Sequence, residues 1–380
     1  MITKSIKRSL FDTIEKHLFT GKAILILGPR QTGKTTLLNG ILKTRDEKPL
    51  LLNCDDPTVR DILEHASIAT LRNIIGDSKL IFIDEAQRVT DIGITLKLIT
   101  DEFKEVQLLV SGSSALELSN GINEPLTGRK WEYFLYPISW QELVDATTYF
   151  EAYKQLEQRI LYGMYPEVVT SQHREQELLT QLASSYLYKD LLSYTGIRKP
   201  ELLDKLLKAL ALQLGQEVSY NELAGLLQVD KNTIIQYIQL LEKAFIVMRL
   251  QPLSRNVRTE ISTSRKIYFW DTGIRNTLIG NFKDLKSRTD AGALWENFLV
   301  VERLKYLQYN KIICNRFFWR TTAQQEIDYV EERDGNLYAF EFKMKANANV
   351  RFSKTFIKGY PDAETKTITI ENFHEFLTAL

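Results

Sequence analysis

The stretch "AILILGPRQTGKTTLL", residues 23–38, decides how the first part of the chain folds. A short apolar run is followed at once by the pattern G-x-x-x-x-G-K-[ST], which joins a strand to a helix and binds phosphate. The glycines are required because backbone N–H groups at the start of the helix must approach the phosphates closely. The stretch therefore predicts a binding site for ATP or GTP.

Two side chains of this loop have specific expected roles. Lys34 is expected to place its charge on the β- and γ-phosphates and to act in catalysis, and Thr35 to offer its hydroxyl group to Mg²⁺. ATP and Mg²⁺ are the predicted cofactors. The residues expected to contact the nucleotide are Gly28, Pro29, Arg30, Gln31, Thr32, Gly33, Lys34, Thr35 and Thr36.

A second motif, "LIFIDEAQ" at residues 80–87, completes the predicted site. Its apolar residues form a strand that ends at Asp84, at the edge of an open α/β sheet where ligands bind. Asp84 is expected to hold Mg²⁺ through water. Glu85 is expected to orient or deprotonate the attacking water, and the alternative is a solvated carboxylate at the strand end.

The order of strand-like runs predicts the fold class. Apolar runs at residues 23–27, 50–53, 80–84 and 106–112 alternate with helical patterns. This alternation predicts an α/β domain with a parallel sheet covered on both faces. The run at 50–53 comes between the phosphate loop and Asp84. It predicts an extra strand inserted between those two strands, as in ATPases that use a catalytic glutamate.

Two further residues are candidates for sensing the γ-phosphate. Ser113 follows the strand in "VSGSS", although a plain turn is the alternative. Arg129 in "LTGRKW" is a candidate arginine finger, acting on its own nucleotide or on that of a neighbouring copy. The alternative for Arg129 is a surface arginine without a catalytic role.

The motifs together carry a resemblance. "GPRQTGKTTLL", "LLLNCDDP", "LIFIDEAQR", "VSGSSALEL", "LTGRKW" and "LYPISWQEL" occur in this order, followed by "GMYPEVV", "YIQLLEKAFIV", "IYFWDTGIRN", "GALWENFLVVERL", "EIDYV" and "FEFK". The chain resembles prokaryotic AAA+-related ATPases whose C-terminal domain, of unknown function, has a nuclease-like fold. The resemblance implies an ATPase domain in residues 1–145, a helical lid or linker in 146–198, a winged helix-turn-helix in 199–270 and a restriction-endonuclease-like PD-(D/E)xK domain in 271–380.

The middle region has a helix–turn–helix pattern of its own in residues 219–247. Asp230 is the expected N-cap of the second helix. A basic run between residues 249 and 266 coincides with the expected wing, where phosphate contacts are plausible. Double-stranded DNA is one predicted partner, and a protein contact or a purely structural role is the alternative. The residues predicted to contact DNA are Lys231, Asn232, Thr233, Arg255, Arg258 and Arg265.

The C-terminal region contains a hairpin pattern, "EIDYV" at 326–330 and "LYAFEFKMK" at 337–345. Asp334-Gly335 is a strong signal for a two-residue turn. That turn pairs Arg333 with Asn336, so Asp328 should lie opposite Glu341. Two facing carboxylates repel each other unless a cation lies between them, and oxygen ligands at this separation suit Mg²⁺.

This hairpin leaves two functional alternatives open. Lys343 is expected to orient water or to stabilise the charge that develops during phosphodiester cleavage. Glu296 in "GALWENFLVVERL" is a further candidate ligand, and the alternative is an exposed helix carboxylate. The predicted metal ligands here are therefore Glu296, Asp328 and Glu341, beside Thr35 and Asp84 in the first site. The rival hypothesis is a closed, inactive domain that only binds DNA or protein.

Composition limits the remaining classes of protein. The formal net charge of the 380 residues is +1, so any basic surface must be local. No apolar run is long enough for a signal peptide or a membrane span, and we expect a cytoplasmic protein without a membrane partner. The overall prediction is an ATP-hydrolysing protein that acts on DNA, with a nuclease-like domain. The alternative is a nucleotide-gated regulator that binds DNA, a partner protein or a second copy of itself.

Overall fold

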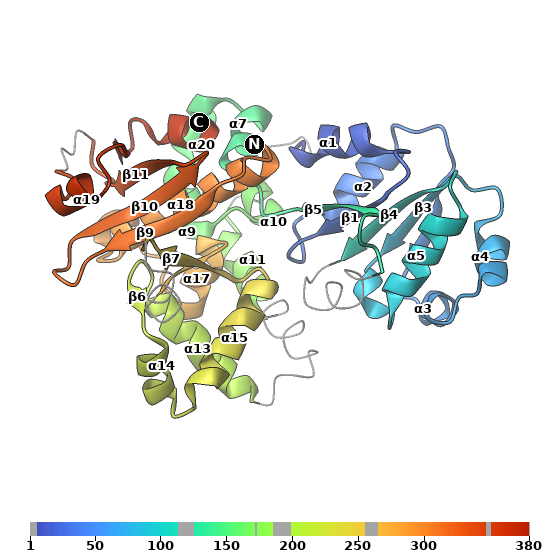
Figure 1. Cartoon of the computed structure of the whole chain (residues 1–380), viewed down its shortest axis with the longest axis horizontal. Helices are drawn as coiled ribbons and strands as arrows, with labels where there is room; N and C mark the ends of the chain where they lie inside the picture. Colours follow the sequence, from blue (N-terminus) through green and yellow to red (C-terminus); the bar gives the residue numbers. More distant parts are fainter. Residues whose placement is uncertain are drawn as a thin grey trace. The chain divides into compact units, whose positions relative to one another are not determined.

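A computed structural model describes residues 6–112, 125–171, 173–184, 199–254, 265–346 and 351–379 (Figure 1). The chain divides into two compact units. The first unit contains Ser5–Ile138 and Lys243–Phe245, and the second contains Ser139–Glu242 and Ile246–Leu380. Ser113, Arg255 and Arg258 lie outside the described residues, so their predicted roles stay predictions.

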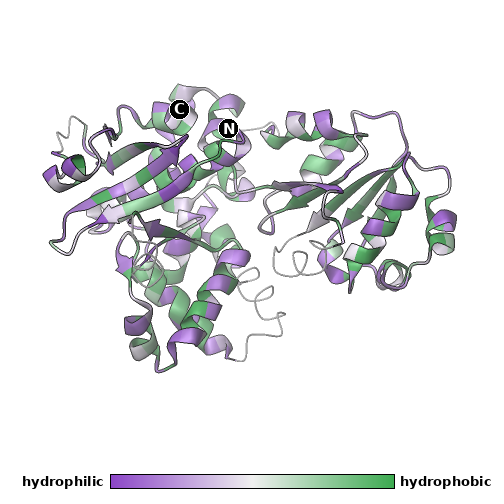
Figure 2. Cartoon of the chain, in the orientation of Figure 1, coloured by the Kyte–Doolittle hydropathy of each residue, from purple (hydrophilic) through white to green (hydrophobic). Residues whose placement is uncertain are grey.

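The first unit is built on a parallel five-stranded sheet in the order β2-β3-β4-β1-β5. Its strands are β1 (Ala23–Leu27), β2 (Leu50–Asn53), β3 (Leu80–Asp84), β4 (Gln107–Gly112) and β5 (Lys130–Phe134). All five positions of β1 and all six of β4 are buried, and the central strands are hydrophobic in Figure 2. The predicted parallel α/β sheet is therefore confirmed.

Helices accompany these strands along the chain. They are α1 (Leu10–His17), α2 (Lys34–Leu42), α3 (Pro57–Glu64), α4 (Ile68–Ile75), the 3₁₀ turn η1 (Ala86–Arg88) and α5 (Ile92–Glu102). α2 starts at Lys34, directly after the last glycine of the phosphate loop. The helix N-terminus therefore lies where the loop pattern predicts it.

The predicted inserted strand is present, but the prediction did not identify which strand it is. β4 lies between β1 and β3, whereas β2 pairs with β3 alone at the edge of the sheet. The burial of the two strands explains this order. β4 is apolar and fully buried, while Leu51 of β2 is 59% exposed, as an edge strand permits.

The second unit begins with a helical region and continues into a region that mixes helices and strands. Ser139 starts the first helix with a capping box, because its side chain accepts from Glu142 N while Glu142 bonds back to Ser139 N. The helices are α7 (Trp140–Ala146), α8 (Tyr149–Lys154), α9 (Leu156–Tyr162), α10 (Pro166–Thr170), α11 (Glu175–Leu182), α13 (Pro200–Leu212), α14 (Tyr220–Leu227), α15 (Lys231–Lys243), α17 (Thr272–Ile279), η3 (Leu285–Ser287), α18 (Ala291–Tyr309), α19 (Lys354–Gly359) and α20 (Phe373–Thr378).

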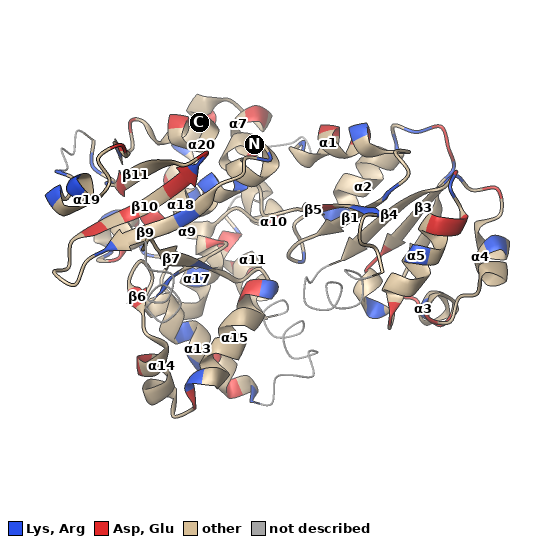
Figure 3. Cartoon of the chain, viewed as in Figure 1, with Lys and Arg blue, Asp and Glu red and all other residues tan. Residues whose placement is uncertain are grey.

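A seven-stranded mixed sheet in the order β12-β11-β10-β9-β7-β8-β6 joins the middle and C-terminal regions. The parallel pairing of β7 with β9 makes this join, so the domain boundary expected near residue 270 falls within one sheet. Figure 3 shows acidic residues on β10. The strands are β6 (Glu217–Val218), β7 (Val247–Pro252), β8 (Arg265–Phe269), β9 (Asn315–Arg320), β10 (Glu326–Arg333), β11 (Asn336–Phe342) and β12 (Glu364–Ile368).

The hairpin of β10 and β11 has the predicted register. Arg333 pairs with Asn336, and the pairing continues as far as Tyr329 with Phe340. Asp334 and Gly335 have φ values of 50° and 81°, as a two-residue turn with left-handed residues requires. Beyond the last pair, the Asp328 side chain accepts a hydrogen bond from Phe342 N at 2.8 Å. Asp328 is therefore held against the strand that carries Glu341.

The cysteines and the hydropathy of the helices are two further properties of the chain. Cys54 and Cys314 are both free thiols. Among the helices of the described ranges, none combines the length and apolar character that crossing a bilayer requires.

Candidate nucleotide site and carboxylate cluster

The phosphate loop has a backbone that only glycine tolerates at its two ends. Gly28 has a φ of 148°, and a Cβ atom there would lie 2.2 Å from the carbonyl oxygen of Leu135. Gly33, at the start of α2, has a φ of 90°. Both values lie where L-residues with side chains are strained. The loop pattern in the sequence is therefore explained by close backbone packing as well as by phosphate binding.

Lys34 is held over this loop by backbone carbonyls. Its side chain is buried, and its Nζ donates to Gly28 O at 2.9 Å and to Pro29 O at 2.7 Å. Thr32 Oγ1 also donates to Pro29 O, at 2.9 Å. The ammonium group thus lies within the curve of the loop, where phosphates bind in such loops.

Arg8 is a part of this site that the sequence pattern did not reveal. Its guanidinium donates to Thr32 O at 2.5 Å and to Tyr136 O at 2.6 Å. It therefore fixes the loop backbone to the chain segment that follows β5. No local motif surrounds Arg8, so only the folded structure identifies it.

Thr35 and Asp84 meet at the predicted Mg²⁺ position. Thr35 Oγ1 lies 3.1 Å from Asp84 Oδ2. A hydroxyl and a carboxylate oxygen at this spacing are hard ligands of the kind that Mg²⁺ prefers. The residues present therefore fit the ion that the loop pattern implies.

Glu85 follows Asp84 in a strained backbone conformation. Its φ is 53°, in the left-handed region, which is uncommon for a residue with a side chain and is found at active sites. Its N–H donates to Asp84 Oδ1 at 3.1 Å and to Ser111 Oγ at 3.3 Å. Gln87 Nε2 donates to Glu85 Oε2. These bonds fix both the backbone and the carboxylate of the predicted base.

Ser111, near the end of β4, is a serine that the structure describes beside the site, and the role predicted for Ser113 stays a prediction. Its hydroxyl is buried and donates to Asp84 Oδ1. Strand pairing explains why Ser111 lies beside Asp84. Because β4 lies next to β3, the serine near the end of β4 is the one that contacts the carboxylate.

Arg129 lies at the opposite end of the sheet from its own phosphate loop. It directly precedes β5, which runs parallel to β1, and its carbonyl oxygen accepts from Ala23 N at the start of β1 at 2.9 Å. The five residues of β1, about 16 Å at 3.3 Å each, separate Ala23 from the loop. Its Nε instead lies 2.7 Å from Asp101 Oδ1. This placement argues against action on its own nucleotide and leaves action on a neighbouring copy as a prediction.

The second unit contains a carboxylate cluster formed by Glu296, Glu326, Asp328 and Glu341. Lys343 Nζ lies 3.1 Å from Glu341 Oε2 and 3.8 Å from Asp328 Oδ2. Burial and the neighbouring Asp328 carboxylate raise the pKa of Glu341 to about 7, and Lys343 opposes this shift. The prediction that Asp328 and Glu341 act on each other is supported by this electrostatic coupling.

Glu296 points into this cluster but carries partners that the sequence did not suggest. Its Oε1 accepts from Lys266 Nζ at 2.8 Å and from Tyr268 Oη at 2.6 Å. The side chain is 13% exposed, so the alternative of an exposed helix carboxylate is wrong. Burial raises the pKa of Glu296 to about 6, while Lys266 lowers it.

The predicted Mg²⁺ site of Glu296, Asp328 and Glu341 is not preformed. Within the described ranges, no group of three or more His, Cys, Asp or Glu side chains is arranged to hold a metal ion. The physical reason is that ammonium groups already contact the carboxylates: Lys266 holds Glu296 and Lys343 holds Glu341. The residues present therefore do not fit a divalent ion in this arrangement.

The predicted DNA contacts separate into exposed and buried residues. Lys231 and Asn232 are exposed at the start of α15. Thr233 is half-buried and its N–H and hydroxyl both bond to Asp230, which confirms Asp230 as the N-cap. Arg265 is only 8% exposed, so this residue is a poor candidate for phosphate contact. It lies in β8, where all five positions are buried.

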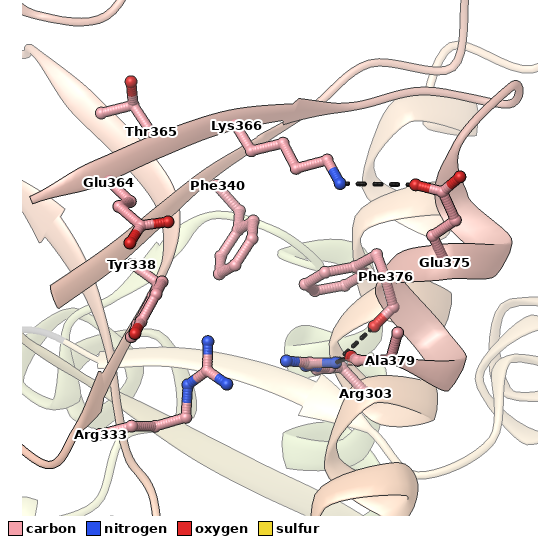
Figure 4. A pocket seen from close by; sticks show the side chains of 10 residues that line it. All are labelled: Arg303, Arg333, Tyr338, Phe340, Glu364, Thr365, Lys366, Glu375, Phe376 and Ala379. Carbon is pink, nitrogen blue, oxygen red and sulfur yellow. Dashed lines mark hydrogen bonds and ion pairs between the residues drawn. The ribbon is translucent and has the colours of Figure 1, made fainter. Parts of the chain in front are cut away.

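A cavity of about 380 Å³ lies between β11, β12, α18 and α20 (Figure 4). Each Lys and Arg side chain that lines it lies close to a carboxylate. Arg303 forms a bidentate pair with Glu331 at 2.8 and 3.0 Å, and Arg333 lies 3.3 Å from Glu331. Lys366 faces Glu375 at 3.6 Å. This cavity therefore lacks the excess positive charge of a phosphate site. It is lined by Arg303, Arg333, Tyr338, Phe340, Glu364, Thr365, Lys366, Glu375, Phe376 and Ala379.

Comparison with known proteins supports the nucleotide site of the first unit. Residues 20–144 match the profile of the AAA domain. Residues 153–285 and 291–375 match two domains of unknown function, DUF8612 and DUF4143. An uncharacterized protein of Mycobacterium tuberculosis is 28% identical over 350 residues, which cover 90% of this chain and 75% of that protein. An uncharacterized protein of Haemophilus influenzae is 25% identical over 305 residues, 74% of each chain.

Solved structures that are similar to this chain include a Walker-type ATPase of Pyrococcus abyssi. It is 15% identical, the match covers 72% of this chain and 94% of that chain, and the TM-score is 0.47. The profile match, the strand order and the loop geometry agree on the first unit. The chain carries an AAA-type P-loop ATPase domain in residues 20–144.

Proposed function

We propose that the first unit binds ATP with Mg²⁺ and hydrolyses it. The observation that carries this proposal is the junction where Thr35, Asp84 and Glu85 meet, with Thr35 Oγ1 3.1 Å from Asp84 Oδ2. Thr35 and Asp84 would hold Mg²⁺, which supplies charge neutralisation at the β- and γ-phosphates when bound. Lys34 adds a fixed positive charge within the loop. Its side chain is buried, and its attraction to the phosphates is stronger there because little water screens it.

Glu85 acts as the base in this proposal. Its carboxylate accepts the proton of the attacking water while the water oxygen bonds to the γ-phosphorus. The bond from that phosphorus to the β,γ-bridging oxygen breaks, so that ADP leaves with the bridging oxygen and phosphate is the other product. Gln87 orients the carboxylate by donating to Oε2, and the Ser111 hydroxyl orients the backbone of Glu85. The chain therefore supplies a base whose position is fixed before the substrate binds.

Glu85→Gln tests this assignment. Glutamine keeps the shape of the side chain but does not accept the proton, so turnover should fall by about 10²-fold or more while ATP binding persists. Turnover is measured by phosphate release and binding by a fluorescent ATP analogue. Glu105→Gln, an exposed glutamate of the same unit, is the matched control and should match the wild type. Normal turnover of Glu85→Gln would show that another group is the base.

A DNA-binding role is proposed for the middle region. Its order α13-β6-α14-α15-β7-β8, with β6 and β7 both paired antiparallel to β8, supports a winged helix-turn-helix. The exposed Lys231 and Asn232 at the N-terminus of α15 are placed as groove or phosphate contacts.

A binding role without cleavage is proposed for the C-terminal region. The order α18-β9-β10-β11-α19-β12, with Glu296 on the helix and Asp328 bonded to Phe342 N beside Glu341 on the hairpin, supports a nuclease-like fold. The ammonium groups in contact with these carboxylates favour a domain that binds DNA or protein rather than a metal-dependent nuclease.

A nicking assay separates these two roles. Supercoiled DNA is incubated with Mg²⁺ or Mn²⁺, with and without ATP, and with the wild type, Asp328→Ala and Lys343→Ala. No nicking by the wild type is the expected result. Metal-dependent nicking that both variants lose would contradict the binding-only proposal and establish the nuclease.

A further inference from the structure

Lys266 is a buried cation that neither the nucleotide site nor the predicted DNA surface requires. It lies on β8, and its side chain is 1% exposed. A buried ammonium group is costly unless carboxylates and hydrogen bonds compensate its lost hydration. The contacts of Lys266 should therefore reveal what it does.

These contacts come from two separate elements. Lys266 Nζ lies 2.8 Å from Glu296 Oε1 on α18 and forms an ion pair with Glu326 at the start of β10. The ammonium also lies over the ring of Phe318 on β9, 5.7 Å from its centroid. One cation from β8 thus joins a helix carboxylate to a hairpin carboxylate.

The surrounding groups complete a closed network. Tyr268, two residues further along β8, donates to the same oxygen of Glu296 at 2.6 Å. Arg320 lies 3.3 Å from Glu326 Oε2. Nearby, Lys343 contacts Glu341 and Asp328. All four carboxylates of the cluster therefore contact a cationic side chain.

We propose that Lys266 is the resident cation of the carboxylate cluster. Its ammonium group occupies the place between Glu296 and Glu326 and supplies the positive charge that a divalent ion would supply in an open site. The cluster is then a built-in ion-pair network that ties β8 to α18 and β10. The proposal goes beyond ATP hydrolysis. Only its comparison with a divalent-ion site rests on the nuclease-like fold proposed for the C-terminal region.

The test is to remove this cation. The full chain carries Asp84→Asn, so that the first unit does not contribute a bound ion, and Lys266→Met is added. Without Lys266, Glu296 and Glu326 repel each other, and Glu296, whose side chain is 13% exposed, loses its cationic partner. We expect Tm to fall by several degrees and added Mn²⁺ to raise it again, whereas Mn²⁺ leaves the Tm of the parent unchanged. Lys286→Met, an exposed lysine, is the matched control and should behave as the parent.

A second variant keeps the proposal testable if Lys266→Met does not fold. Combining Lys266→Met with Glu296→Gln and Glu326→Gln removes the repelling charges and should restore folding without restoring the Mn²⁺ effect. The proposal is overturned if Lys266→Met has the Tm of the parent, or if the triple variant folds no better than Lys266→Met. Mn²⁺ binding by the parent that Glu341→Gln abolishes would also overturn it. DNA nicking by the wild type that persists in Glu341→Gln would instead contradict only the proposed binding role.

Discussion

Thr35 Oγ1 lies 3.1 Å from Asp84 Oδ2, so the first turn of α2 and the end of β3 form one site although the two residues are 49 positions apart. β4 lies between β1, which leads into the phosphate loop, and β3, which carries Asp84, and Ser111 of β4 bonds to Asp84 as well. Asp84, the expected Mg²⁺ ligand, is therefore held in place by contacts from both α2 and β4.

Asp84→Asn should uncouple nucleotide binding from hydrolysis. Asparagine keeps the size of the side chain but removes the charge that holds Mg²⁺. We expect turnover to fall by about 10²-fold or more, and the Mg²⁺ concentration for half-maximal turnover to rise. ATP binding without Mg²⁺ should change little, because Lys34 and the loop remain. Asp77→Asn, at an exposed position, is the control for the loss of an acid. An unchanged Mg²⁺ dependence would contradict the assigned role of Asp84.

Arg129→Ala should leave the turnover of dilute protein unchanged. The Arg129 guanidinium bonds to Asp101 and lies at the opposite end of the sheet from its own loop, and this half-exposed pair contributes about 0–1 kcal/mol. The measurement is turnover per active site across a range of protein concentrations. A loss that appears only at high concentration would support action on a neighbouring copy. A loss at every concentration would contradict the placement of Arg129.

Much of the nucleotide site could be predicted from the sequence because local patterns determine it. Gly28 and Gly33 indicate a backbone with positive φ. The apolar run before Asp84 indicates a buried strand that ends at the edge of the sheet where ligands bind. The order of strands in the sheet could not be predicted, since it depends on packing between distant segments. That order explains why Ser111 was missed.

The carboxylate cluster shows a different limit. The Asp334-Gly335 turn fixed the hairpin register, so the relation of Asp328 to Glu341 was predictable. Lys266 was assigned to a basic surface run because its neighbours in sequence are basic or outside any motif. Its burial depends on β8 pairing with strands on both sides, which sequence spacing does not report. The one signal in the sequence is that Lys266 directly precedes the apolar and aromatic residues 267–270.

Lys231→Ala should weaken DNA binding in a salt-dependent way. If Lys231 contacts a phosphate, its loss should reduce the slope of log K against log salt by about 1, equally for different DNA sequences. Fluorescence anisotropy with a labelled duplex at several salt concentrations measures this slope. Lys205→Ala, an exposed lysine on α13, is the matched control. Equal slopes for Lys231→Ala and the wild type would exclude a phosphate contact at this position.

Glu341→Gln should change how stability depends on pH. The pKa of Glu341 is raised from 4.5 to about 7 by burial and by Asp328, so the folded state holds the proton more tightly than the unfolded state. Between pH 4.5 and 7 the unfolded state therefore loses this proton first, and stability falls as pH rises. At ~1.4 kcal/mol per pKa unit, the loss is about 3 kcal/mol.

Glutamine does not titrate, so the stability of Glu341→Gln should lack this decline and exceed that of the wild type increasingly toward pH 7. Urea unfolding at intervals from pH 4 to 8 measures the difference. Glu371→Gln changes a glutamate outside the cluster and serves as the control, with a pH profile parallel to that of the wild type. A constant difference between Glu341→Gln and the wild type would show that the pKa of Glu341 is the same in the folded and unfolded states, against the raised value. The repulsion from Asp328 would then be fully offset by Lys343, 3.1 Å away.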